Sequence, residues 1–133
     1  MAFRYNTPVT SGNLDTVVAG TVTAASTLLM RHVKEGTLSA HVVLDVETDG
    51  TTVEAVWQVS NNGSTWIECA YAPNSPAVIV LATGTAGADA SVTRSLPAPP
   101  QVYGHLYARI GIINRVNTGA AVDTYAIGYT YRT

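Results

Sequence analysis

The sequence predicts an all-β fold, an antiparallel β-sandwich of about eight strands in a jelly-roll-like arrangement. Valine, threonine and tyrosine are abundant, whereas the helix-favouring residues glutamate, lysine, glutamine and methionine are scarce. Several short segments alternate between apolar and polar residues, which is the period of a strand with one buried face. Clusters of glycine, asparagine and proline separate these segments, as in sandwiches and barrels.

The N-terminal third gives the weakest strand signals. Residues 1–12, which include Pro8 and show no strand periodicity, predict an extended N-terminal arm ahead of a single domain covering residues 13–133. Residues 14–23 predict a strand with Gly20 as a candidate bulge. The apolar residues between positions 24 and 33 fit a short helix or a strand, and we favour the strand.

The middle of the chain gives the clearest signals. Residues 38–47 follow the period of a strand, with one apolar face and one mostly polar face that includes Val43. A turn at Asp49-Gly50 leads to a strand over residues 53–60. Asn61-Asn62-Gly63 follows, and Asn-Gly is a strong hairpin signal because both residues tolerate positive φ. We therefore expect the chain to return as a strand over residues 64–71.

The second half predicts further strands, each bounded by prolines, glycines or asparagine. Residues 77–83 form a continuous apolar run after two prolines, which indicates a strand buried on both sides. The remaining predicted strands are residues 90–96, 104–115 and 122–132. The last of these places its large apolar side chains on one face and threonine, alanine and glycine on the other.

Charged residues are unusually few. Nine acidic and seven basic residues make up 12% of the 133 residues, whereas a typical soluble domain has about 25%. A net charge of −2 with a single lysine argues against a disordered tail and against nucleic acid as a partner. No secretory signal or membrane-spanning run is visible, so we expect synthesis in a cytoplasm and no membrane partner.

No motif predicts catalysis. His32, His41 and His105 lack metal-ligand spacing, and Cys69 has no basic neighbour in sequence that would activate its thiol. Nucleophile, phosphate-loop and zinc-protease motifs are missing. The sequence therefore predicts no enzyme, no catalytic residue, no cofactor and no bound metal.

The aromatic residues leave two interpretations open. Trp57 shares a face with apolar neighbours, which predicts burial, whereas Trp66 follows the Asn-Gly turn and has no clear face. Trp66 and the closing tyrosines could stack on sugar, or they could lie in the core or at a subunit interface. We favour the second interpretation.

A resemblance emerges from the hairpin over residues 55–66, where Gln-Val-Ser, an Asn-Gly turn and Ser-Thr-Trp follow one another. Together with Tyr-Ala-Arg-Ile at residues 107–110 and the tyrosine-rich end, the chain resembles the capsid decoration (cement) proteins of tailed bacteriophages. The resemblance implies a non-enzymatic virion protein on the outer head surface that stabilises the shell. Its partners would be the major capsid protein and copies of itself, a trimer among the states allowed.

The same interpretation supplies a set of candidate contact residues in the arm and on the aromatic faces. These candidates are Phe3, Arg4, Tyr5, Pro8, Trp66, Tyr125, Tyr129 and Tyr131. Two alternatives stay open at this point: a carbohydrate-binding β-sandwich displayed on the virion, and a structural subunit of a tail or neck ring. The scarcity of charge favours an assembly component, with strand faces that are buried against neighbouring subunits.

Overall fold

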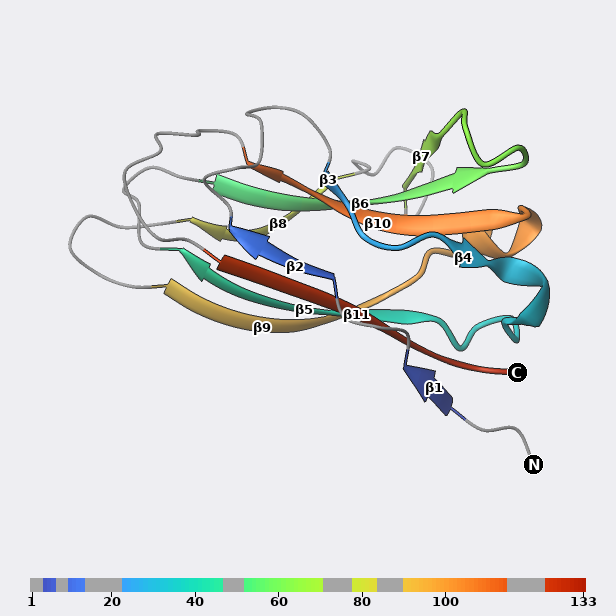
Figure 1. Cartoon of the computed structure of the whole chain (residues 1–133), viewed down its shortest axis with the longest axis horizontal. Coiled ribbons are helices and arrows are strands. Elements are labelled where there is room, and N and C mark those ends of the chain that lie inside the picture. Colours follow the sequence, from blue (N-terminus) through green and yellow to red (C-terminus); the bar gives the residue numbers. More distant parts are fainter. Residues whose placement is uncertain are drawn as a thin grey trace.

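The computed structural model, shown in Figure 1, describes residues 4–6, 10–13, 23–46, 52–70, 78–83, 90–114 and 124–133. The described residues are almost entirely strand, with two short 3-10 helices. The elements in chain order are β1 (Arg4–Asn6), β2 (Thr10–Asn13), β3 (Thr23–Ala24), β4 (Leu28–Leu29), η2 (Met30–His32), β5 (Ser39–Val46), β6 (Thr52–Ser60), β7 (Ile67–Cys69), β8 (Val78–Thr83), β9 (Ala90–Pro97), η3 (Pro100–Gly104), β10 (Tyr107–Asn114) and β11 (Thr124–Arg132).

Two antiparallel sheets lie face to face (Figure 1). In sheet A, β11 pairs with β1 and β2 along one edge and with β5 along the other, and β5 pairs with β9. In sheet B, β10 pairs with β3 and β4 along one edge and with β6 along the other. The far edge of β6 pairs with β7 and β8.

The strand order is that of a jelly roll. Three pairs of segments each share one edge of a partner strand: β1 and β2 on β11, β3 and β4 on β10, and β7 and β8 on β6. When each pair counts as one strand, eight strands remain in chain order. Their order is 1-8-3-6 in sheet A and 2-7-4-5 in sheet B. This arrangement of two interlocked Greek keys defines the jelly roll. The predicted all-β sandwich of jelly-roll type is confirmed.

The core lies between the two sheets and follows the predicted alternation. Leu38, Ala40, Val42 and Leu44 point inward from β5 and its start, while His41 and Val43 point outward. Trp57 of β6 is 1% exposed, as its apolar neighbours predicted. Its ring centroid lies 6.1 Å from that of Tyr129, which reaches in from the opposite sheet at an interplanar angle of 43°.

A hydrogen bond joins the two sheets through this core. The amide of Ile110 in β10 donates to the hydroxyl of Tyr129 in β11 over 2.9 Å. This amide is free because the strand beside it is interrupted: Ala24 pairs with Gly111 and Leu28 with Ala108, so three residues, 25–27, lie opposite two. The Tyr129 hydroxyl therefore satisfies a buried donor that the sheet leaves unpaired.

The loop between β6 and β7 is wider than the predicted turn at Asn61-Asn62-Gly63. The Ser60 hydroxyl accepts the amides of Asn62 and Gly63 at 3.2 and 2.9 Å. The Asn62 side chain accepts the amides of Ser64 and Thr65, each at 2.8 Å. Gly63 takes φ +77°, as expected of an Asn-Gly turn. The hairpin is confirmed, but side-chain capping holds residues 61–66 in the loop and shortens the predicted 64–71 strand to Ile67–Cys69.

Two other expectations change in detail. Residues 24–33 combine strand pairing at Leu28–Leu29 with the 3-10 turn η2, so both predicted alternatives apply in part. The strand predicted to begin at residue 104 begins at Tyr107, because η3 precedes it after a proline-rich start. Within η3, the Tyr103 hydroxyl accepts the Leu38 amide at 2.9 Å and fixes this turn to the start of β5.

Several predicted features lie outside the described residues. These are the turn at residues 49–50 and most of the strand predicted over residues 14–23, with its candidate bulge at Gly20. Of the predicted arm, residues 4–6 and 10–12 are described, and they run along the edge of sheet A beside β11. The arm as a separate contact element, and its boundary with the domain, stay predictions.

Tyr129→Phe should lower the free energy of unfolding by about 1–3 kcal/mol, because the buried Ile110 amide loses its acceptor. Chemical denaturation measures this loss. Tyr125→Phe is the matched control, because the Tyr125 side chain is half-buried and its hydroxyl has no hydrogen-bond partner within the described residues. Equal effects of the two substitutions would contradict a stabilising role for the cross-sheet bond.

Stability should fall above pH 10. Burial raises the pKa of Tyr129 to about 12, although the Ile110 hydrogen bond and the charge of Arg109 act against this. An unfolded tyrosine ionises near pH 10. Between these two pH values the unfolded chain binds fewer protons than the folded one. Raising the pH therefore lowers the free energy of unfolding by up to about 3 kcal/mol. Urea unfolding at pH 9 and pH 11 measures the loss, which should be smaller in Tyr129→Phe.

Candidate functional site

The outer face of sheet A is almost free of charge. The outward residues of β11, β5 and β9 lie side by side in rows across the three strands. Asp45 lies at one end of this face and Arg132 at the other. No acidic residue, lysine or arginine occupies an outward position of these three strands between Asp45 and Arg132. The positions between them hold Ala126, Gly128, Thr130, Val43, His41, Ser39, Thr93, Ser95 and Pro97.

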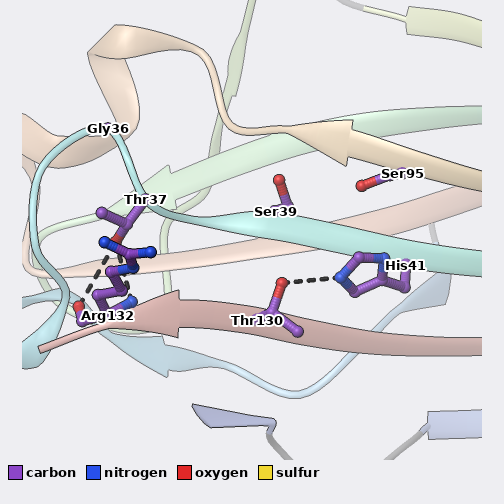
Figure 2. A pocket seen from close by; sticks show the side chains of 7 residues that line it. All are labelled: Gly36, Thr37, Ser39, His41, Ser95, Thr130 and Arg132. Carbon is purple, nitrogen blue, oxygen red and sulfur yellow. Dashed lines mark hydrogen bonds between the residues drawn. The ribbon is translucent and has the colours of Figure 1, made fainter. Parts of the chain in front are cut away.

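A shallow polar pocket of about 430 Å³ opens on this face (Figure 2). Three strands and the turn before β5 contribute its walls. The lining residues are Gly36, Thr37, Ser39, His41, Ser95, Thr130 and Arg132. Four hydroxyls, one imidazole and one guanidinium therefore gather in one depression, and the only side-chain carbons there belong to polar residues.

One wall of the pocket is tied to the end of β11. The Lys34 amide donates to the Arg132 carbonyl at 2.7 Å, and the Arg132 amide donates to the Thr37 hydroxyl at 3.0 Å. The same hydroxyl donates to the Lys34 carbonyl at 2.7 Å. Gly36 takes φ +79°, which a side chain would disfavour, so the turn folds back over the strand end. These bonds hold the backbone on both sides of Arg132 in place.

The opposite wall is formed by His41 and Thr130. Nε2 of His41 lies 2.7 Å from the Thr130 hydroxyl, a hydrogen bond visible in Figure 2. Gly128 lies directly opposite His41 in the register and carries no side chain, so the imidazole can reach diagonally across β11. The ring is thereby fixed at the rim of the pocket while remaining exposed.

Sheet B carries a different outer face. Val56, Gln58 and Ile113 occupy outward positions, yet they are buried, which the sequence did not predict. Arg109 donates to Gln58 Oε1 over 2.8 Å, and its guanidinium carbon lies 3.9 Å from the Trp66 ring centroid. Burial lowers the pKa of Arg109. Trp66 is therefore half-buried under a cation and does not present a free stacking platform.

The predicted contact residues are dispersed through the fold. Arg4 and Tyr5 lie in β1, where the register sets Arg4 opposite Arg132 and Tyr5 opposite Tyr131. Phe3 and Pro8 lie outside the described residues. The other predicted contact residues differ in exposure: Trp66, Tyr125 and Tyr131 are half-buried, and Tyr129 is 1% exposed.

The position of Tyr129 in the core removes it from any contact surface. Its ring packs on Trp57 and its hydroxyl is bonded to the Ile110 amide, so the side chain faces the opposite sheet. Tyr125 and Tyr131 share its inward face and pack against the core, which leaves their outer edges as the part a partner could touch.

The groups considered for catalysis are also dispersed. Cys69 is buried, and burial raises the pKa of its thiol, which fits the predicted structural thiol. His32 lies 3.2 Å from Nε of Arg31, and His41 bonds to Thr130. In the part of the chain that the structure describes, no three histidine, cysteine or acidic side chains form a group that could hold a metal ion.

Sequence reasoning missed the pocket. The signal for it was present, because three predicted strands carry serine, threonine, histidine and glycine at their outward positions. Their adjacency was not readable, because β5, β9 and β11 are far apart in sequence and only the jelly-roll order brings them together.

Exposed apolar side chains occur on both sheets. Val43, on the central strand of the uncharged face and in the row next to Asp45, is 48% exposed, and Ile67 and Leu106 are 60% and 53% exposed near the β6–β7 loop. None of the described helices is long and apolar enough to cross a membrane.

Comparison with known proteins identifies no family for this chain. No family model and no curated protein matches the chain. Among solved structures, the chain is similar to a chain from the structure of infectious bursal disease virus, Gx strain, with 13% identity and a TM-score of 0.49. The match covers 98% of this chain and 32% of that chain, so the present chain spans about a third of its length. A likeness this weak carries no argument about function.

Substituting the two tryptophans should lower the free energy of unfolding by very different amounts. Trp57→Ala should lower it by about 3–5 kcal/mol because the substitution opens a cavity between the sheets. Trp66→Ala should cost about 1 kcal/mol, mainly the contact with Arg109. Urea denaturation followed by circular dichroism compares them. A loss at Trp66 as large as that at Trp57 would contradict the peripheral position of Trp66.

Proposed function

We propose that this chain is a non-enzymatic structural protein of a virus particle, which binds the outer surface of a tailed-phage head and reinforces the shell. The observation that carries the proposal is the uncharged outer face of sheet A, between Asp45 and Arg132. A free soluble domain ordinarily keeps such a face charged for solubility. A face of small side chains around Val43 suits close contact with another subunit.

The fold supports the same class of role. Jelly rolls serve as viral capsid domains and as lectins, among other uses. Sheet A has the segments β1 and β2 at one edge, and sheet B has β7 and β8 at one edge. Within the described residues no further strand pairs with these edges, so their backbone groups could pair with a neighbouring chain. Contacts repeated over a whole shell add up, and a protein that binds only the assembled shell stabilises it by mass action.

Co-sedimentation with empty, expanded heads of the phage that encodes the chain tests this proposal. The full-length chain should pellet with the heads. Val43→Asp should weaken binding about tenfold or more, because the new carboxylate would have to lose its water at the contact. Ser64→Asp, an exposed substitution in the β6–β7 loop, is the matched control and should bind like the unmodified chain.

Other outcomes separate the alternatives. A full-length chain that leaves the heads unbound overturns the decoration role. If it instead forms closed rings in solution, the tail or neck interpretation gains support. Glycan binding that is lost in Trp66→Ala would favour a carbohydrate-binding module. Deleting residues 1–12 is a poor test, because residues 4–6 and 10–12 pair with β11 and their removal exposes its edge.

A further inference from the structure

We propose that the pocket on the outer face of sheet A is a binding site for a carboxylate group, with the Arg132 guanidinium as its principal ligand. The pocket does not depend on the virion role, because its argument rests on donors, charge and shape alone. Its lining combines one cation with hydroxyl groups from three strands and a turn.

The pocket holds donors that the protein itself leaves unused. Within the described residues, the guanidinium of Arg132 and the hydroxyls of Ser39 and Ser95 have no hydrogen-bond or ion-pair partner. The backbone of Arg132, by contrast, is held on both sides by Lys34 and Thr37. The side chain is thus carried by a fixed strand end while its donors remain open to a ligand, an arrangement that lowers the ordering cost of binding.

Figure 2 shows how these donors are arranged. Arg132 and Thr37 stand at one end of the pocket and His41 with Thr130 at the other, and Ser39 lies between them on β5. A planar guanidinium matches the two oxygens of a carboxylate with two parallel hydrogen bonds. The Ser39 hydroxyl can donate to a remaining lone pair, whereas Ser95 lies at the other end of the pocket, opposite His41 in the register. Nε2 of His41 is already engaged by Thr130.

The charge in the pocket favours a carboxylate over a phosphate. Arg132 is the single permanently charged residue among the seven that line the pocket, and no acidic residue lines it. One positive charge balances a carboxylate, whereas a phosphate near neutral pH carries almost two negative charges. The surrounding hydroxyls, with no apolar wall, suit a polar carrier such as an acidic side chain or a sugar acid.

Nuclear magnetic resonance titration of the full-length chain at low salt tests the site. The probes are sodium acetate for the shared chemistry, a blocked glutamate peptide for a protein carboxylate, and a sialic acid methyl glycoside for a sugar carboxylate. Acetate should shift the amides of residues 36–41, 95 and 128–132 in a saturable way. An absence of such shifts with all three probes overturns the proposal.

Variants test the assignment to Arg132. Arg132→Gln should weaken acetate binding about tenfold or more, since a charge-assisted pair is lost. Arg31→Gln is the matched control, because it removes an exposed arginine outside the pocket and should bind like the unmodified chain. Ser39→Ala combined with Ser95→Ala should weaken binding less than Arg132→Gln. Equal loss in Arg31→Gln and Arg132→Gln would show non-specific charge attraction and overturn the site.

The remaining outcomes identify the carrier or refute the geometry. Tighter binding of the glutamate peptide than of acetate indicates a protein partner, and tighter binding of the sugar acid indicates a glycan, and each supports the site. Arg132→Lys keeps the charge but not the planar fork, so it should bind more weakly than the unmodified chain. Unchanged binding in Arg132→Lys overturns the bidentate assignment. The amide spectrum of each variant, away from the substituted position, checks that the fold is intact.

Discussion

The structure depends on closing two sheets over one core while one strand position is interrupted. Residues 25–27 break the pairing beside β10 and leave the Ile110 amide without a strand partner. The Tyr129 hydroxyl, from the other sheet, supplies the acceptor, and its ring packs on Trp57. A single side chain thereby satisfies a buried donor, fills the centre of the core and fixes the spacing of the sheets.

The same principle recurs at the edges of the fold. Tyr103 accepts the Leu38 amide and connects η3 to β5, and the Thr37 hydroxyl both donates to the Lys34 carbonyl and accepts the Arg132 amide. Hydroxyl groups therefore complete backbone hydrogen bonding where the strands end. In this way backbone groups at the strand ends remain hydrogen-bonded.

The two outer faces differ in what they expose. On sheet B, Val56 and Ile113 are buried, and Arg109 lies against Trp66 and Gln58. On sheet A, the small uncharged residues Ala126 and Thr93 flank Val43 on the neighbouring strands, and the pocket opens toward Arg132. A contact on sheet A would gain specificity from shape and from one cation, because the centre of the face offers no array of charges.

The sequence by itself determined the strands and their buried faces. The alternation in residues 38–47 and 124–132 was readable because the side chains of a strand point to opposite faces with a period of two. The all-β class followed from it, as did the burial of Trp57. Local side-chain capping at Ser60 and Asn62 was not readable, since it depends on the loop geometry that those same side chains create.

Apart from the β6–β7 hairpin, only the tertiary structure decided which strands are neighbours. Ser39, Ser95 and Arg132 are separated by dozens of residues, and their convergence depends on the order β11–β5–β9. Tyr129 looked like a candidate contact residue because its strand carries aromatics on one face, and the opposing sheet turned that face into the core. Periodicity tells which side chains share a face, but what covers that face is a property of long-range pairing, which no local pattern encodes.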